Sequence, residues 1–592
     1  MKLGGIMKPV YKNILAILAI SITFSCNEDE FLNKQPPGTA AGDAMATPAG
    51  VEALLIGAYD MLTGDWNGFG SCMATDWVYG DGYSDNAYKG SSFGDQPWFN
   101  ELERYATAPV GEYMEDRWRD CYNGITRAND ALTFLGLSTG IPEDRAIEIE
   151  AEAKFLRAWY HFKATRIWEN IPVVLTVEES GMTPEEVPNS TPGWDEIEND
   201  LQFAIDNLGP TPPRGEVGRP DQWAAMAVKA HAHLYQNELD EAKPLLDDII
   251  SNGGFSLAPD YNDNYHSETE NNVESIFEIQ ISATAADAGA LNANQIGVAL
   301  PSLWRASPAG FGPQAWGFFQ PSQDLFEAFQ TTPDGLPVLD KEDRDPLEND
   351  MGLASAAEFV PTDHPLDPRV DWTIARRGIP ANGWGVFNGA SQIREQSNGG
   401  PYHTLKYMHW NDGELETSRG TNARNFRAYR YSHVLLWRAE IAVEEGDLDY
   451  ARELVNMIRN RAMNSQFVKG RVTDYTLDEQ PDPGDIDMTQ DAANYVISEY
   501  PAGHPAFQTQ EEARKAVQVE SRLEFATEGQ RFFNLRRWGI DGEVLNNYIE
   551  ADVKFRNFLQ GAEYDPEQDD YFPLPQTQLD LQPDVLVQDP AY

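Results

Sequence analysis

Apolar and small side chains recur three and four residues apart along several stretches of the chain, the spacing expected where one face of a helix is buried. The clearest stretch covers residues 151–168, whose buried face would carry Ala151, Phe155, Ala158, Trp159, Phe162, Ala164, Ile167 and Trp168. We expect this helix to end at Asn170, because Pro172 forces the preceding residue out of the helical conformation. The same pattern predicts helices over residues 48–62 and 113–135.

Two segments far apart in the chain repeat one helical pattern. Residues 239–242 (LDEA) are echoed by 448–451 (LDYA), and in both copies apolar residues follow the Ala at the same offsets. Each copy comes after another apolar helix, at 222–237 and 429–445. Two helices joined by a tight turn, with small residues where they cross, form the tetratricopeptide-like unit. The sequence therefore predicts a mostly α-helical fold of tetratricopeptide-like pairs, interrupted by a large loop-rich insertion at about 252–420.

Helical periodicity is lost in two regions that are rich in glycine, polar and aromatic residues. Residues 64–100 are too long for a simple connection, and their aromatic side chains argue against disorder. The insertion has one convincing strand pattern at 276–281 and a weaker one at 404–410. Aromatic rings beside amides and carboxylates suit sugars, so both regions are candidate ligand sites. Aromatic residues in or beside the insertion include Trp304, Phe311, Trp316, Phe318, Phe319, Trp372, Trp384 and Trp410.

The N-terminus has the pattern of an exported lipoprotein. Lys8 and Lys12 precede an apolar segment, residues 14–22, that is too short to span a membrane. A small residue and Cys26 follow it. We therefore predict that residues 1–25 are a signal peptide and that Cys26 is lipidated, which would anchor the protein to a membrane.

These boundaries divide the remaining chain. Residues 26–47 would be the lipidated Cys and its linker, and residues 48–592 a single domain. We expect the helical core of that domain in about 48–251 and 421–592, with the insertion at about 252–420 between them.

The formal net charge of −51 argues against a nucleic-acid partner, because a phosphate backbone is bound by patches of Lys and Arg. It favours neutral or weakly charged ligands. A local basic pocket could still form from a group of arginines that could equally be structural: Arg376, Arg377, Arg424, Arg427 and Arg430.

Candidate metal ligands are few. His231 and His233 are two apart on a predicted helix and so point to different faces, and the sequence has no zinc motif. Asp76, Asp81 and Asp85 could hold a structural calcium ion, although their spacing matches no calcium-binding loop. We therefore predict no metal site of a known motif.

Two cysteines, Cys72 and Cys121, remain once Cys26 is assigned to the lipid. An oxidising export route would permit a disulfide between them without requiring one. Both outcomes are compatible with the sequence.

Several motifs spread over the mature chain point to one family. The helix at 151–168 runs into ENIPVV, and the C-terminal part carries ESRLEFATEGQRFFNLRRWG at 520–539. Further motifs are ESIFEIQ at 274–280, DPRVDWT at 367–373, LLWRAEIAVEEG at 435–446, LVNMIRNRA at 454–462 and FPLPQTQLDLQP at 572–583. Together they resemble the SusD/RagB family of outer-membrane nutrient-binding lipoproteins, although Gln578 and Gln582 stand where that family often has acidic residues or Asn.

The resemblance implies a SusD-like, cell-surface lipoprotein that captures oligosaccharides or polysaccharide and delivers them to a SusC-like TonB-dependent transporter of the outer membrane. It implies no enzymatic activity and no cofactor. The alternative cargo is peptide, as in RagB-like members. In this family the ligand contacts tend to come from the loop after the first helix and from the insertion, which favours these glycan-binding residues: Trp66, Trp77, Asp81, Tyr83, Asp85, Asn86, Trp98, Trp304 and Trp316.

Two other functional classes are compatible with parts of the sequence. Residues 90–94 (GSSFG) match a nucleophile elbow, but no buried strand precedes them and no helix follows. A surface glycosidase would need two carboxylates at a fixed separation, and the 95 acidic residues do not single out a pair. A tetratricopeptide adaptor that binds a peptide in a groove is the other class.

One acidic pair requires separate comment. Glu524 and Glu528 lie one turn apart in a helix predicted over 520–530. We expect them to form exposed ion pairs with Arg522 and Arg531 rather than to act as a catalytic acid and base.

Overall fold

The computed structural model describes residues 45–64, 71–281, 303–304, 314–408, 410–411, 424–477, 480–481 and 483–592. The predicted signal peptide, Cys26 and most of the predicted linker lie outside the described residues, as does Trp66. No helix in the described part of the chain is both long enough and apolar enough to cross a membrane.

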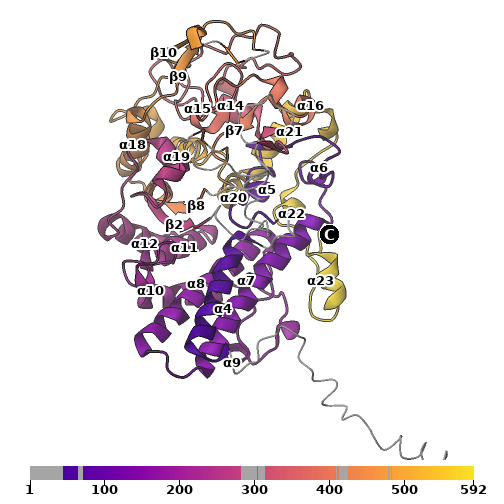
Figure 1. Cartoon of the computed structure of the whole chain (residues 1–592), viewed down its shortest axis with the longest axis vertical. Helices are drawn as coiled ribbons and strands as arrows, with labels where there is room; N and C mark the ends of the chain where they lie inside the picture. The colour runs from indigo at the N-terminus through magenta and orange to yellow at the C-terminus, as the bar shows by residue number, and fades with distance from the viewer. Residues whose placement is uncertain are drawn as a thin grey trace, which may run out of the picture.

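Long helices pack against one another in chain order, each contacting the next. They are α4 (Pro48–Asp60), α7 (Glu112–Leu137), α8 (Glu143–Trp168), α10 (Trp194–Asn207), α11 (Gln222–Tyr235), α12 (Leu239–Asn252), α17 (Tyr431–Glu445), α18 (Leu448–Asn464) and α19 (Gln510–Glu524). In Figure 1 this array runs from α4, α7 and α8 at the bottom to α18 and α19 at the upper left. The mostly helical fold is confirmed, and the hairpins α11–α12 and α17–α18 are the two predicted tetratricopeptide-like pairs.

The ends of these helices follow local chemistry. Thr47 caps α4, because its hydroxyl accepts a hydrogen bond from the backbone N–H of Gly50 at 3.1 Å. The central helix α8 ends at Trp168, and Glu169 takes up a positive φ of 56°. The prediction that Asn170 caps this end was wrong: the chain leaves the helix one residue earlier, and the Asn170 amide donates to the Glu169 side chain.

The two ends of the insertion meet in a short sheet. Strand β2 (Ser275–Ile279) pairs antiparallel with β8 (Phe426–Arg430), just before α17. The strand predicted at 404–410 was wrong, since among the described residues of that range (404–408 and 410) strand structure is limited to the end of β7 (His403–Thr404), which pairs with β6 (Ile374–Ala375). The chain turns at once after β7, and this turn brings the Lys406 ammonium to the buried Glu528 carboxylate at 2.7 Å.

Residues 71–91, within the first predicted loop, lie inside the protein. Strand β1 (Ala87–Gly90) pairs antiparallel with β5 (Phe318–Pro321) of the insertion. Trp77 stacks on Phe319, with ring centroids 4.9 Å apart. The two regions predicted to form the site are therefore adjacent, but they meet through buried residues that join the helical array to the insertion.

A close crossing fixes this interior segment against the C-terminal part of the chain. A Cβ atom at Gly80 would overlap the carbonyl group of Gly529, and Gly529 itself has a φ of +74°. Helix α19 accordingly ends at Glu524, and residues 525–530 form a turn before α20 (Arg531–Trp538). The single helix predicted over 520–530 was wrong, because this crossing requires a turn.

The C-terminal segment returns to the first helices. The backbone N–H of Phe572 donates to Ile167 at 2.8 Å, and that of Gln576 to Pro109 at 2.9 Å. The remaining elements are α5 (Trp77–Gly80), α6 (Phe99–Leu102), α9 (Val177–Ser180), β3 (Leu303–Trp304), β4 (Gln314–Ala315), α14 (Gln323–Ala328), α15 (Val370–Thr373), α16 (Gln396–Gly399), β9 (Lys469–Val472), β10 (Ile486–Asp491), α21 (Asp541–Asp552), α22 (Pro566–Asp569) and α23 (Gln576–Leu581).

The cysteines do not form the disulfide that the sequence permits. Cys121 is a free, buried thiol whose Sγ lies 3.8 Å from the Met73 sulfur. It is therefore not bonded to Cys72, which is also buried.

Candidate functional site

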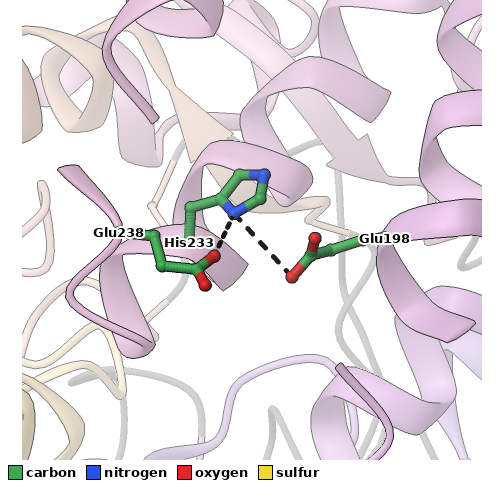
Figure 2. Close-up of side chains that lie close together, drawn as sticks. All are labelled: Glu198, His233 and Glu238. Atoms are coloured by element: carbon green, nitrogen blue, oxygen red, sulfur yellow. Dashed lines mark hydrogen bonds and ion pairs between the residues drawn. The ribbon is translucent and has the colours of Figure 1, made fainter. Parts of the chain in front are cut away.

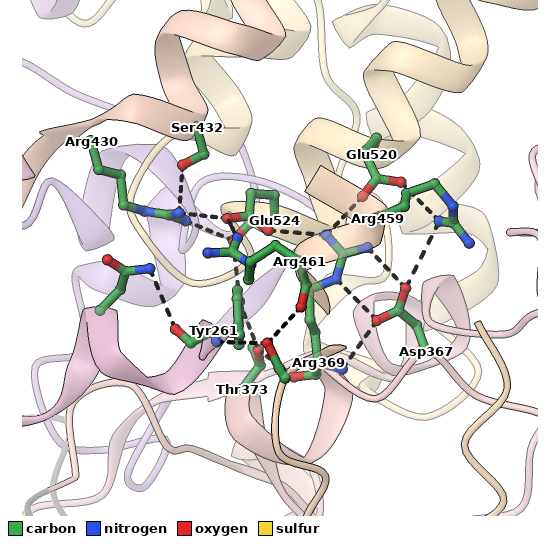
Figure 3. A network of polar contacts seen from close by, with 12 residues as sticks. Tyr261, Asp367, Arg369, Thr373, Arg430, Ser432, Arg459, Arg461, Glu520 and Glu524 are labelled. Carbon is green, nitrogen blue, oxygen red and sulfur yellow. Dashed lines mark hydrogen bonds and ion pairs between the residues drawn. The ribbon is translucent and has the colours of Figure 1, made fainter. Parts of the chain in front are cut away.

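Charged side chains from the insertion and from the C-terminal helices meet inside the protein (Figure 3). At the centre is Glu524, the last residue of α19, whose carboxylate pairs with Arg369 at 3.0 Å and also with Arg430 and Arg461. All four side chains are buried. Burial alone would raise the pKa of the Glu524 carboxyl, but Arg461, Arg430 and Arg369 outweigh it and hold that pKa well below its usual range.

The network extends to both sides of Glu524. Arg430 also pairs with Glu274 at 2.8 Å and with Glu528 at 2.9 Å. Burial alone would raise the pKa of the Glu528 carboxyl, but the positive charges of Arg430 and Lys406 outweigh burial and lower this pKa to about 2. On the other side, Arg459 pairs with Glu520 at 2.9 Å. Because removing one partner from such a group leaves buried charges unpaired, the network fixes its segments relative to one another.

Most members of this network come from four of the sequence motifs, while Arg430 and Lys406 lie outside them. ESIFEIQ supplies Glu274, DPRVDWT supplies Asp367 and Arg369, LVNMIRNRA supplies Arg459 and Arg461, and the long C-terminal motif supplies Glu520, Glu524 and Glu528. These motifs therefore hold the fold together. The expectation that Glu524 and Glu528 form exposed ion pairs was wrong, because both of these glutamates are buried.

The expected partners of the two glutamates were also wrong. Arg522 pairs with Asp85 at 3.0 Å and with Asp324 at 2.8 Å, and Arg531 pairs with Asp85 at 2.8 Å. These two arginines thus bind the interior segment of the first loop to the C-terminal turn. Neither Glu524 nor Glu528 is placed to exchange a proton with a ligand in solvent.

The same network positions a tryptophan of the insertion. Arg369, which directly precedes the short helix α15, and Thr373, its last residue, belong to the network drawn in Figure 3. Between them, Trp372 is half-buried and its indole N–H donates to the carbonyl of Gln466 at 2.9 Å. Its ring lies 5.8 Å from that of Trp410, which in turn lies 4.9 Å from the ring of His266. We call Trp372, Trp410 and His266 the tryptophan cluster.

Polar groups border the tryptophan cluster. Gln466 is exposed, and its backbone and side-chain N–H groups both donate to the Asp260 carboxylate, at 2.7 and 3.2 Å. Asn411 is exposed next to Trp410. The indole N–H of Trp410 is itself buried and has no hydrogen-bond partner among the described residues, so Trp410 offers a ligand its ring rather than this N–H. Aromatic faces, amides and a carboxylate at one partly exposed place are the groups that bind sugar rings and hydroxyls.

The residues predicted from the first loop are placed differently. Five of them are buried: Trp77, Asp81, Tyr83, Asp85 and Asn86. Asp81, for example, accepts hydrogen bonds from the Asn86 amide at 2.9 Å and from the N–H of Gly529 at 2.5 Å, and burial raises its pKa to about 7. In this conformation these five side chains do not reach a ligand in solvent, because the β1–β5 sheet and the C-terminal turn cover them.

The other residues predicted to contact a glycan remain candidates. Trp98 and Trp316 are half-buried and pack against the main core, which leaves part of each ring accessible. Trp304 belongs to β3, but its side chain lies outside the described part of the chain, as does all of Trp66. Trp372 and Trp410 were noted among the aromatic residues of the insertion but not selected, although the DPRVDWT motif contains Trp372.

The residues considered for a basic pocket and for a calcium site are buried and form ion pairs or hydrogen bonds within the protein instead. The arginines near residues 376 and 427 are buried, and Arg376, for example, pairs with Asp371 at 2.7 Å. Asp76 pairs with Arg117 at 2.6 Å and with Lys163 at 2.5 Å, whereas Asp81 and Asp85 have the separate partners given above. The three aspartates are thus satisfied individually by protein groups.

Comparison with known proteins identifies relatives of the chain. Family models match residues 273–592, described as "SusD family", and residues 30–234, described as "Starch-binding associating with outer membrane". SusD-like protein P25 of Formosa agariphila is 28% identical over 276 residues, which are 45% of this chain and 51% of that protein. A SusD-like protein of Bacteroides ovatus is 24% identical over 285 residues, 45% of this chain and 49% of that protein. The chain thus aligns with about half the length of these curated relatives.

Solved structures share the fold over nearly the whole chain. A SusD superfamily protein from Bacteroides vulgatus has a TM-score of 0.65 at 21% identity, covering 92% of this chain and 99% of that chain. Surface glycan-binding protein A from Bacteroides thetaiotaomicron, solved in complex with laminarihexaose, has a TM-score of 0.63 at 21% identity, covering 92% and 100%. At these identities the likeness establishes the fold.

Proposed function

The chain belongs to the SusD family, whose model matches more than half of it, and from this premise we propose that it is a binding lipoprotein of the outer membrane that captures oligosaccharides or polysaccharide at the cell surface. The observation that carries the proposal is the tryptophan cluster, where half-exposed indole rings stand beside exposed amides. Support also comes from proteins of the same fold, one of which is a laminarin-binding SusD-like protein and another of which was solved in complex with laminarihexaose. The protein binds its ligand without cleaving it.

The tryptophan cluster sets the expected strength of binding. Each aromatic platform contributes about 0.5–1.5 kcal/mol beyond the area it buries, whereas micromolar capture requires about 8 kcal/mol. Two indole rings therefore supply a minor part of the binding free energy. The rest comes from the area buried on binding and from hydrogen bonds to neighbours such as Gln466 and Asn411. The net charge of −51 favours a neutral glycan, because an acidic polymer would be repelled at long range.

Glycan capture is tested by affinity gel electrophoresis and calorimetry with neutral polysaccharides, acidic polysaccharides and a peptide digest. We expect saturable binding to a neutral polysaccharide, weakened about tenfold or more by Trp372→Ala or Trp410→Ala, since a loss of 1.4 kcal/mol is tenfold. Phe555→Ala is the control, because this ring is 56% exposed and lies after α21 rather than in the insertion. No new reducing ends should appear.

The alternatives give different results in the same experiment. Binding of peptide alone would replace glycan with the RagB-like cargo. Binding that is lost in Trp98→Ala but kept in Trp372→Ala and Trp410→Ala would move the site to the first loop. Release of reducing ends from bound glycan would contradict the absence of enzymatic activity.

The proposed partner is a SusC-like TonB-dependent transporter, to which the captured glycan is delivered. This step rests on family membership. When the protein is extracted from outer membranes in mild detergent, we expect a large β-barrel transporter to co-purify with it. Purification of the protein alone, from membranes in which the transporter is present, would contradict the partnership and leave glycan capture intact.

A further inference from the structure

Three potential metal ligands converge at the first tetratricopeptide-like hairpin, far in sequence from the tryptophan cluster (Figure 2). His233 comes from α11, Glu238 from the turn between α11 and α12, and Glu198 from α10. The His233 Nδ1 atom lies 2.8 Å from a Glu238 carboxylate oxygen and 3.7 Å from one of Glu198. One donor atom of each residue lies within 4.8 Å of the other two. We propose that these three residues bind a divalent transition-metal ion, for which Zn²⁺ is the representative.

The charges of the site suit such an ion. Neither Glu198 nor Glu238 pairs with a lysine or arginine among the described residues, and His233 is the basic group that each approaches. A single imidazole N–H can donate well to only one carboxylate, whereas a cation held between the three groups satisfies both. One neutral imidazole and two carboxylates carry a charge of about −2, which matches a divalent ion.

The donor types select the class of metal. Calcium and magnesium prefer oxygen ligands alone, whereas an imidazole nitrogen together with carboxylates suits zinc and its neighbours. Zinc–ligand distances of about 2.0–2.2 Å in a tetrahedron place ligand atoms about 3.4 Å apart. The observed separations, 2.8 and 3.7 Å, lie on either side of this value. The third separation, between the Glu198 and Glu238 oxygens, is within 4.8 Å, so rotation of the two glutamate side chains would bring all three donor atoms onto one ion.

The surroundings give the site access and orientation. The His233 side chain is 5% exposed, whereas those of Glu198 and Glu238 are 21% and 44% exposed, so a hydrated ion can approach from the carboxylate side. The Gln236 amide donates to Glu198 at 2.6 Å and to the carbonyl of Ala232 at 3.3 Å, which orients the Glu198 carboxylate. Three protein ligands leave one position for water. A bound ion would join α10, α11 and the start of α12.

The proposal is tested on the purified protein after treatment with a chelator. We expect calorimetry to show binding of Zn²⁺ that weakens at least about tenfold in Glu198→Gln and in Glu238→Gln, since each loses one ligand charge. Glu241→Gln is the matched control, because this glutamate is exposed on α12 and lies outside the cluster. Glutamine keeps the side-chain size, and circular dichroism of the metal-free variants checks that they fold.

Two further readouts make the outcome decisive. Zn²⁺ should raise the unfolding temperature of the wild-type protein but not of the double variant Glu198→Gln/Glu238→Gln. Co²⁺ should give the intense visible absorption of a four-coordinate site in the wild type only. The proposal is overturned if the double variant binds Zn²⁺ as tightly as the wild type, or if the wild type binds none at about 100 μM, well above typical site affinities.

Discussion

At the scale of single residues, the buried carboxylate of Glu524 has the greatest expected effect on stability. Replacing it in Glu524→Gln leaves Arg369, Arg430 and Arg461 without their shared counter-charge, and breaking a buried ion pair on one side costs about 3–5 kcal/mol. We expect a loss of this size in the free energy of unfolding, measured by denaturant titration with the slope compared between variants.

The matched control for this variant is Glu444→Gln. Glu444 pairs with Arg514 at 2.8 Å, but the two side chains are 39% and 43% exposed. Exposed pairs are worth at most about 1 kcal/mol. Equal losses in the two variants would show that the burial of the Glu524 network carries no additional stability.

Residue identity alone could not separate core aromatics from surface aromatics. A tryptophan offers the same large apolar area to a neighbouring ring or to a sugar, and the choice depends on contacts distant in sequence. Trp77 is buried because Phe319 of the insertion stacks on it, whereas Trp372 is half-exposed because α15 is fixed through the residues on either side of it. For the same reason Glu524 was expected at the surface with Arg522 and Arg531 as partners, whereas its actual partners, Arg369, Arg430 and Arg461, come from segments distant in sequence.

At the scale of elements, periodicity predicted the long helices well, and it failed where a tertiary contact sets the backbone. The helices α4, α7, α11 and α17 lie close to their predicted ranges, because each buries a continuous apolar face, and α8 ends close to its predicted end but begins at Glu143, eight residues earlier than predicted. In contrast, the turn at residues 525–530 exists because Gly529 and Gly80 cross. The sequence around each residue gives no sign of such a crossing other than the glycine itself.

The same limit applies to the first loop. The described part of this aperiodic sequence, residues 71–100, was correctly predicted to be ordered, and it contains α5, β1 and the start of α6. Its depth could not be predicted, because the backbone polar groups of β1 are satisfied by β5, more than two hundred residues later. The position of a strand whose partner lies in an insertion can be predicted only when the fold of that insertion is known.

At the scale of the whole molecule, opposing charge effects set the dependence of stability on pH. The net charge of −51 destabilises the compact state through self-repulsion at neutral pH, and protonation of surface carboxylates relieves it. Asp81 acts in the same direction: its pKa is raised to about 7 by burial, so the folded protein binds this proton more tightly and gains stability as the pH falls from 7 towards 4.

The buried network acts in the opposite direction at lower pH. The pKa values of Glu274, Glu524 and Glu528 are lowered in the folded protein, because the arginine charges outweigh burial. Their contribution to stability is therefore present above the unfolded pKa of about 4.3 and is lost as the pH falls towards about 2, the pKa of Glu528. The unfolding temperature should thus rise from pH 7 to a maximum near about pH 5 and then fall steeply.

Calorimetric scans at pH 7, 5 and 3 and constant ionic strength measure this profile. Added salt should raise the unfolding temperature at pH 7, where surface repulsion is greatest, and much less near pH 5, because screening acts on exposed charges more than on buried pairs. A steady fall of the unfolding temperature from pH 7 to 5 would mean that protonating surface carboxylates costs more stability, through lost attraction to surface Lys and Arg, than it gains by relieving their mutual repulsion. In that case the acidic surface would contribute ordered ion pairs to the fold, and the buried network would no longer be the main electrostatic stabiliser of the protein.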